Sequence, residues 1–84
     1  MKIFGYVKSN EEDLQELDEV TFQASSRELT DIANFLLKYA EVMRNEGSSF
    51  EHAHMVDEYE ALKNTKPDII VYNGEELSNE ASEK

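Results

Sequence analysis

The chain has 84 residues, no cysteine and a formal net charge of −11. A chain of this length forms one domain with one modest core. Without cysteine it has no disulfide, no thiol nucleophile and no thiolate metal site. Its negative field repels nucleic acid and anionic membrane surfaces, which are bound through Lys and Arg. The same field attracts a basic protein.

No apolar run approaches the roughly 20 residues that a membrane-spanning helix requires. The apolar opening of the chain is short and is interrupted by Lys8, which does not fit a signal peptide. We therefore expect a cytoplasmic protein. Its carboxylates are concentrated, since residues 9–19 hold six of them and no Lys or Arg.

The first part of the chain predicts two strands. Residues 2–8 alternate between two faces and carry β-branched and aromatic side chains, which is typical of a strand. Gly5 within this run indicates a bulge or the close approach of a packed helix. The acidic residues 9–16 are interpreted as a polar connection. Residues 17–24 again alternate between apolar and polar side chains, which predicts a second strand of an antiparallel sheet with one wet face.

A long amphipathic helix follows. Ser25 and Glu28 have the spacing of a capping box, in which the serine hydroxyl and the glutamate carboxylate each bind the other's backbone N–H. Gly47 suits the left-handed conformation that ends a helix after Glu46. The apolar stripe of this helix consists of Leu29, Ile32, Ala33, Leu36, Ala40 and Met43, widened on one side by Phe35, Tyr39 and Val42.

The last part of the chain predicts shorter elements. Residues 50–56 alternate and are interpreted as a third strand, and residues 58–63 as a short helical turn. Residues 68–72 form a continuous apolar run, which indicates a strand that is central or covered on both faces. Residues 74–84 are polar and acidic, and we expect a disordered tail there.

These elements predict an α+β fold with residues 1–73 as a single domain and residues 74–84 as an acidic tail. One long amphipathic helix packs on a three- or four-stranded, mainly antiparallel sheet in a ββαββ-like order. In the three-stranded alternative the histidine segment is a loop or a short helix.

His52 and His54 are the one pairing that could form a metal or catalytic site. Their spacing places both imidazoles on one face of a strand. A metal site needs a third ligand, and Glu51, Asp57 and Glu58 lie close in sequence. Asp57, however, would point to the opposite face of a regular strand, and the helical zinc signature is absent. We expect no metal and no cofactor.

The sequence offers little for catalysis. Four serines lie at the ends of the predicted helix, where capping explains them, and none of them lies in a Gly-x-Ser-x-Gly turn; they are Ser25, Ser26, Ser48 and Ser49. Three glycines are too few for a phosphate-binding loop. A general acid requires a carboxyl group buried in a cleft, and one helix on a small sheet leaves little room for one. We therefore expect no catalytic residues and no enzymatic activity.

Three tyrosines are the aromatic side chains most suited to exposure, namely Tyr6, Tyr59 and Tyr72, each surrounded by acids. Tyrosine beside carboxylates is a composition suited to an Arg- or Lys-rich partner. The alternative is that these rings lie at the rim of a small core.

Five segments together resemble a known family. They are MKIFGY at the start, EVT at 19–21, DIANFLL at 31–37, the F-x-H-x-H element at 50–54 and PDIIV at 67–71. Their order and spacing resemble the immunity protein 32 family of bacterial polymorphic toxin systems over nearly all of residues 1–73. The resemblance implies a small cytoplasmic protein that binds and neutralises a cognate toxin.

We therefore predict a binding protein whose acidic surface blocks a basic toxin, with no nucleic-acid or membrane partner and with its oligomeric state open. The residues predicted to steer the toxin electrostatically are Glu11, Glu12, Asp13, Glu16, Asp18 and Glu19. The residues predicted to make closer contact are His52, His54, Asp57 and Tyr59. Two alternatives are a small metal-binding domain that uses the two histidines and an acidic adaptor for some other basic protein.

Overall fold

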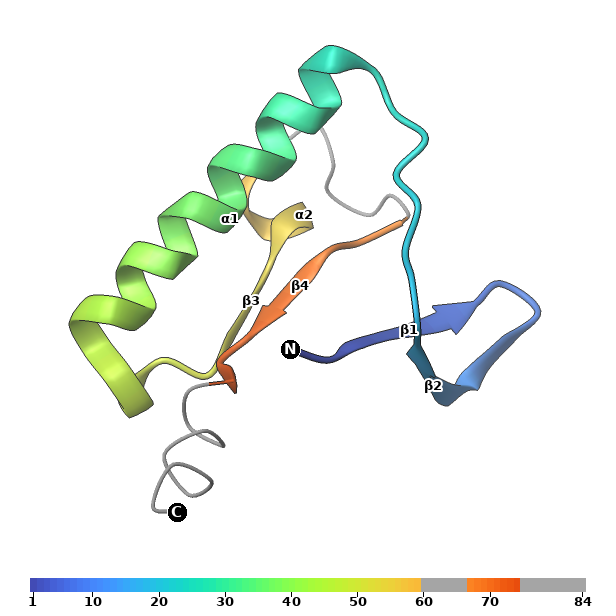
Figure 1. Ribbon diagram of the computed structural model, residues 1–84, viewed down its shortest axis with the longest axis horizontal. Helices are drawn as coiled ribbons and strands as arrows, with labels where there is room; N and C mark the ends of the chain where they lie inside the picture. Colours follow the sequence, from blue (N-terminus) through green and yellow to red (C-terminus); the bar gives the residue numbers. More distant parts are fainter. Residues whose placement is uncertain (60–66, 75–84) are drawn as a thin grey trace.

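A computed structural model of the chain describes residues 1–59 and 67–74 and shows an α+β protein. Its elements, in order, are β1 (Ile3–Val7), β2 (Asn10–Leu17), α1 (Ser26–Glu46), the short 3₁₀ turn η1 (Gly47–Ser49), β3 (His52–His54), α2 (Met55–Glu58) and β4 (Ile70–Tyr72). Within these residues the strands form two separate antiparallel pairs, β1–β2 and β3–β4 (Figure 1). The single three- or four-stranded sheet predicted from the sequence is not found there, because β1 and β4 are not paired.

β1 and β2 form a hairpin with a two-residue turn at Lys8 and Ser9. The register shifts between Gly5 and Val7, so the irregularity predicted at Gly5 is present. A Cβ at Gly5 would lie 3.2 Å from Cδ1 of Leu17. The close approach at this glycine therefore comes from a side chain of β2, not from a helix.

Two predictions for this part of the chain are wrong. The acidic segment 9–16, interpreted as a connection, supplies most of β2. The strand predicted over residues 17–24 is absent beyond Leu17, and residues 18–25 connect the hairpin to α1. The physical reason is that strand pairing uses backbone groups, so a tight turn can pair an acidic segment with β1 despite its low β-propensity.

α1 confirms the predicted helix and its caps. The backbone N–H of Glu28 donates to Oγ of Ser25 at 3.1 Å, and the N–H of Ser25 donates to Oε1 of Glu28 at 2.8 Å. Gly47 ends the helix with a φ of 59°. These local signals involve residues three positions apart or a single backbone angle, which is why sequence alone locates them.

The core lies between α1 and the β3–α2–β4 segment. Phe35, Phe50 and Met55 are its buried apolar residues among those described. The ring of Tyr39 lies 5.2 Å from that of Phe35 and 5.3 Å from that of Phe50, measured between centroids. Leu36, at the centre of the predicted stripe, is exposed. Burial therefore centres on the flank of the stripe that carries Phe35 and Tyr39.

β3 confirms the predicted third strand in a shorter form, and β4 does the same for the final strand. The prediction that the final strand is central is wrong for the described residues, because β4 pairs with β3 alone. Ile70 and Tyr72 are both more than half exposed. The apolar run reflects exposed side chains at a sheet edge rather than burial on two faces.

The remaining predictions concern the end of the chain. α2 begins at Met55, earlier than the helical turn predicted over residues 58–63, most of which lies outside the described residues. The predicted tail, residues 74–84, also lies outside them apart from Gly74. None of the helices in the described ranges has the length and apolar character needed to cross a bilayer.

Candidate functional site

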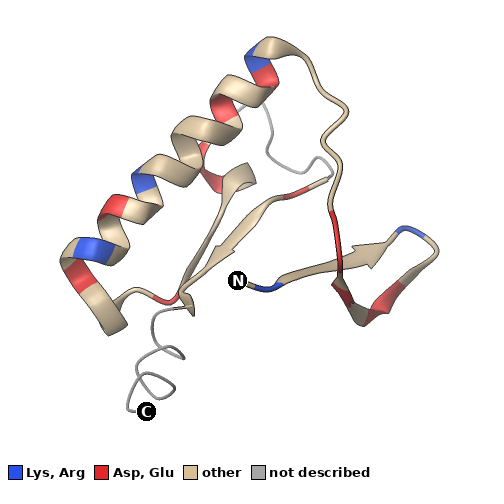
Figure 2. Cartoon of the chain, viewed as in Figure 1, with Lys and Arg blue, Asp and Glu red and all other residues tan. Residues whose placement is uncertain are grey.

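β2 is an exposed acidic strand. Its eight residues include four carboxylates and no Lys or Arg, and Leu17 is its one residue that is not exposed. Glu12, Asp13 and Glu16 form no ion pair within the described residues. Asp18 and Glu19 are exposed directly after this strand. All six predicted steering residues therefore lie on the outer strand of the hairpin or just beyond it (Figure 2).

His52 and His54 lie on the same side of β3, with ring centroids 5.3 Å apart. Nδ1 of His52 lies 3.0 Å from Oε1 of Glu51, and Nδ1 of His54 lies 2.6 Å from Oδ2 of Asp68. The ring of Tyr72, which is opposite His52 in the β3–β4 pair, stacks on the ring of His52. Each imidazole is thus oriented by a carboxylate.

This pair has no third metal ligand among the described residues, which contain no group of three or more His, Cys, Asp or Glu able to hold a metal ion. Asp57 lies in α2 and not on the strand. Orientation of an imidazole by a carboxylate is common in metal sites, where it leaves Nε2 free for the metal. Within the described residues, however, the two imidazoles have no third side chain that could complete a metal site.

The other predicted contact residues lie at α2. Asp57 is exposed, whereas Tyr59 is half-buried and its hydroxyl donates to the carbonyl of Asp31 at 3.2 Å. The β1–β2 hairpin packs only loosely against α1, β3 and β4. The predicted site residues therefore form two separate groups, one on the hairpin and one on β3 and α2, which the structure does not bring together.

An exposed cluster joins α2 to α1. Lys38 Nζ and the hydroxyl of Tyr39 both donate to the carboxylate of Glu58, the latter at 2.6 Å. The hydrogen bond from Lys38, followed by that from Tyr39, holds the pKa of Glu58 below its ordinary value. The hydrogen bonds to Glu58 raise the pKa of Lys38 and of Tyr39. Glu58 is therefore a structural carboxylate that tethers the short helix.

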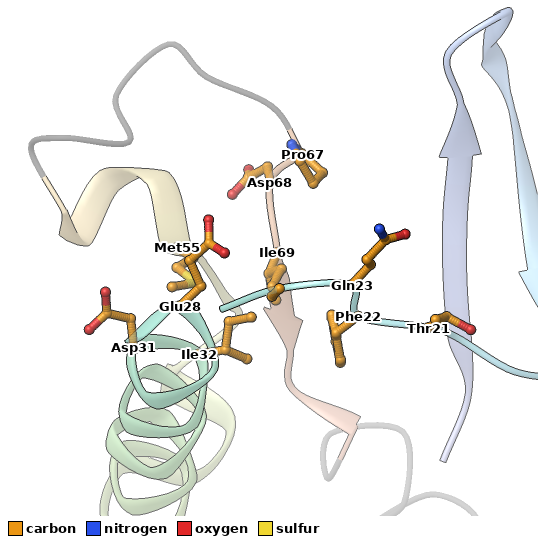
Figure 3. Close-up of a pocket in the computed structure, with 11 residues that line it drawn as sticks. Thr21, Phe22, Gln23, Glu28, Asp31, Ile32, Met55, Pro67, Asp68 and Ile69 are labelled. Carbon is orange, nitrogen blue, oxygen red and sulfur yellow. The ribbon is translucent and has the colours of Figure 1, made fainter. Parts of the chain in front are cut away.

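A cavity of about 360 Å³ lies between the start of α1, the connection that precedes it, and the segment before β4. Figure 3 shows Phe22, Ile32 and Ile69 around this space. Among the described residues that line it, three are carboxylates, those of Glu28, Asp31 and Asp68, and none is a lysine or arginine. Apolar walls with acidic groups suit the aliphatic stem and the cationic head of a lysine or arginine side chain.

The three carboxylates differ in their existing bonds. The backbone N–H and then the hydroxyl of Ser25 hold the pKa of Glu28 below its ordinary value. Asp68 binds His54 and also accepts from the backbone N–H of Val56 at 3.2 Å. The carboxylate of Asp31 has no hydrogen-bond or ion-pair partner among the described residues. Asp31 is therefore the one of these three carboxylates that no described residue already binds.

Sequence reasoning missed this cavity. The signal that could have indicated part of it is the three-residue spacing of Glu28 and Asp31, which places both on one face of α1. Asp68 comes from the other end of the chain, and only the packing of α1 against the segment before β4 adds it to the pair.

Comparison of the chain with protein-family models, with curated proteins and with solved structures finds no match.

Proposed function

We propose that this chain is a protein-binding domain that neutralises a basic bacterial toxin by covering its surface. The observation that carries the proposal is the cavity beside α1, whose described lining residues include three carboxylates and no lysine or arginine. Such a cavity suits a lysine or arginine of the partner, and anchors of this kind contribute most of the energy of an interface. The proposed action is non-catalytic, needs no cofactor and takes place in the cytoplasm.

The hairpin supports the proposal by a separate route. β2 presents four carboxylates on an exposed strand, in a chain whose net charge is −11. Opposite potentials raise association rates by roughly 10- to 1,000-fold at low ionic strength. In this mechanism the hairpin steers the partner and the cavity beside α1 retains it.

The resemblance to the immunity protein 32 family supports a toxin, rather than another basic protein, as the partner. The protein encoded by the gene directly upstream distinguishes the two readings. A large secreted protein with a variable C-terminal toxin domain fits immunity, and any other gene favours the acidic adaptor.

The experiment that tests the proposal is calorimetric binding of the C-terminal toxin domain encoded upstream, with Asp31→Asn as the diagnostic variant. We expect about tenfold or greater loss of affinity, since a hydrogen bond to a charged group contributes about 1.5–3 kcal/mol. The matched control is Glu46→Gln, which removes one exposed negative charge at the far end of α1.

Two results would contradict the proposal. If the wild-type chain does not bind the toxin domain, toxin neutralisation is wrong. If both variants bind as the wild type does, the cavity does not anchor the partner.

A metal site at His52 and His54 is the second candidate function. The observation in its favour is that a carboxylate binds Nδ1 of each ring, the arrangement that orients metal-bound histidines. It ranks lower because the described residues supply no third ligand. Zinc, nickel or copper are the cations that imidazole ligands suit.

A further inference from the structure

A large hollow separates the β1–β2 hairpin from α1 and β4. Its volume is about 1540 Å³, and both of its sides carry apolar side chains. The large ones that are at least two-fifths exposed are Met1, Phe4, Tyr6, Leu14, Val20, Phe22, Leu36, Ile70 and Tyr72. Exposed apolar surface that gathers around one hollow marks an interaction site rather than the ordinary scatter of apolar residues on a surface.

The edge of β4 that faces away from β3 has backbone groups with no partner among the described residues. The N–H of Met55 donates to the carbonyl of Ile69, and the N–H of Asn73 donates to the carbonyl of Glu51, both at 2.8 Å. Backbone groups of alternate residues in an antiparallel pair point the same way. The backbone N–H and C=O groups of Ile69, Val71 and Asn73 therefore point toward β3. Those of Ile70 and Tyr72 point away from it.

β1 supplies the other side of the hollow. It pairs with β2 alone among the described strands, and in Figure 1 β4 lies between β3 and the start of β1. Two strand edges thus border one apolar hollow without pairing with each other. An open strand edge is a template for another extended chain, whose backbone satisfies its N–H and C=O groups.

Charge distinguishes between the possible occupants. β2 adds four carboxylates and no base to the hairpin. Among the described residues that line the hollow, Asp68 is acidic and Lys2 and Lys8 are basic. A second copy of the chain would bring another net charge of −11 to the contact. A basic segment is attracted instead, and apolar residues at its alternate positions would cover the exposed side chains on both sides.

We propose that an extended segment of the toxin, with apolar and basic residues in alternation, adds as a strand along the free edge of β4 and fills the hollow up to β1. This inference rests on the proposed function for the identity of the partner. β1 and β4 run in opposite directions (Figure 1), so a strand that is antiparallel to β4 lies parallel to β1 and joins the two strand pairs into one mixed layer. Recognition then depends on backbone hydrogen bonds at Ile70 and Tyr72 rather than on their side chains alone.

Paired substitutions test the backbone bonds. Ile70→Pro removes an N–H that points away from β3 and leaves the bonds between β3 and β4 in place, because proline is tolerated where the N–H side of an edge strand is free. Ile70→Ala removes the side chain and keeps the N–H. Tyr72→Pro and Tyr72→Ala form a second pair in case one proline variant does not fold, as judged by circular dichroism.

Binding is measured with two probes, the upstream-encoded toxin domain and a short synthetic peptide of alternating valine and lysine. We expect each proline variant to bind about tenfold more weakly than its alanine counterpart. A decrease of this size corresponds to the loss of about one backbone hydrogen bond. We also expect the amides of Ile70 and Tyr72 to gain protection from hydrogen exchange when either probe binds.

The outcomes separate this inference from the proposed function. If the toxin domain binds and each proline variant equals its alanine counterpart, strand addition is wrong and toxin binding stands. If the toxin domain does not bind, the proposed function fails, and the peptide still reports on the edge of β4. If protein concentration alone protects the Ile70 and Tyr72 amides, a second copy occupies the edge and the inference is overturned.

Discussion

The side-chain amide of Asn73 donates a hydrogen bond to the main-chain carbonyl of Phe50 at 2.8 Å. The same amide nitrogen also donates to the carbonyl of Gly47 at 2.9 Å. Asn73 is fully buried, and it is the buried polar residue of the described part of the chain. One side chain after β4 thereby fixes the turn that follows α1, which sets the position of β3 and β4 relative to the helix.

Asn73→Ala is expected to lower the free energy of unfolding by about 1–3 kcal/mol, because the carbonyl of the buried Phe50 loses its hydrogen bond from Asn73, whereas the carbonyl of Gly47 still accepts from the N–H of Phe50. Asn73→Asp should cost more, since its carboxylate would face two carbonyl oxygens. Urea unfolding measures both effects. Asn45→Ala, at an exposed position near the end of α1, is the control and should change stability little. Equal stability of the Asn73 and Asn45 variants would show that the buried amide does not hold the turn.

Glu58→Gln is expected to lower the melting temperature at neutral pH and to have a smaller effect in acid. The folded chain holds the pKa of Glu58 below its ordinary value of 4.5. A carboxyl group of this kind stabilises the fold above its unfolded pKa, and its contribution is lost as the pH falls through the lower, folded pKa. Melting curves recorded from neutral pH to below pH 4.5 measure the difference.

Asp57→Asn is the control for this pH dependence, since Asp57 lies in the same short helix and is exposed. Its melting temperature should follow the wild type throughout the acid range. A Glu58→Gln effect of the same size at every pH would indicate that the amide itself disturbs α2, independently of the lost charge.

Neutralising the four carboxylates of β2, by Gln at Glu11, Glu12 and Glu16 and by Asn at Asp13, is expected to slow association with the toxin domain about tenfold or more at low salt. The salt dependence of the association rate should flatten, because exposed charges are screened over about 8–10 Å at ordinary ionic strength. The dissociation rate should change little. Stopped-flow binding measures both rates.

The control carries the same number of neutralised carboxylates outside the hairpin and away in sequence from the predicted contact residues, at Glu41, Glu46, Glu80 and Glu83. If the two variants associate equally slowly, net charge rather than the hairpin controls association. If the hairpin variant associates at the wild-type rate at low salt, the acidic strand contributes to solubility and not to steering.

Zinc is expected to bind weakly and to leave the melting temperature unchanged when it is removed with a chelator. The reason is that His52 and His54 supply two ligands, whereas stable zinc sites use three or four from the protein. Metal analysis of the purified protein, together with a zinc titration, tests this. One tightly bound metal per chain that is lost in His52→Ala would reverse the ranking of the two candidate functions.

Part of the fold could be predicted because its causes are local. The cap formed by Ser25 and Glu28, the end of α1 at Gly47 and the strand character of His52 to His54 depend on neighbouring residues. Side-chain hydrogen bonds across three positions, a positive φ and a two-residue alternation are all visible in a linear sequence.

The pairing of the acidic segment with β1 could not be predicted in the same way. β2 forms because the turn at Lys8 and Ser9 brings its backbone against β1, and backbone pairing is indifferent to the carboxylates that made this segment resemble a connection. The apolar residues that indicated a strand around Phe22 instead line cavities. Pairing energy, not intrinsic preference, decided which segment became the strand.

The sequence by itself determined the composition of this protein's surfaces: a strongly negative chain, an acidic segment before a long capped helix, and two histidines on one strand face. Tertiary structure alone decided that Asp31 and Asp68 line one cavity and that β1 and β4 border one hollow without pairing. The difference is physical, since charge and capping act within a few residues, whereas cavities and strand edges arise from contacts between segments far apart in the chain.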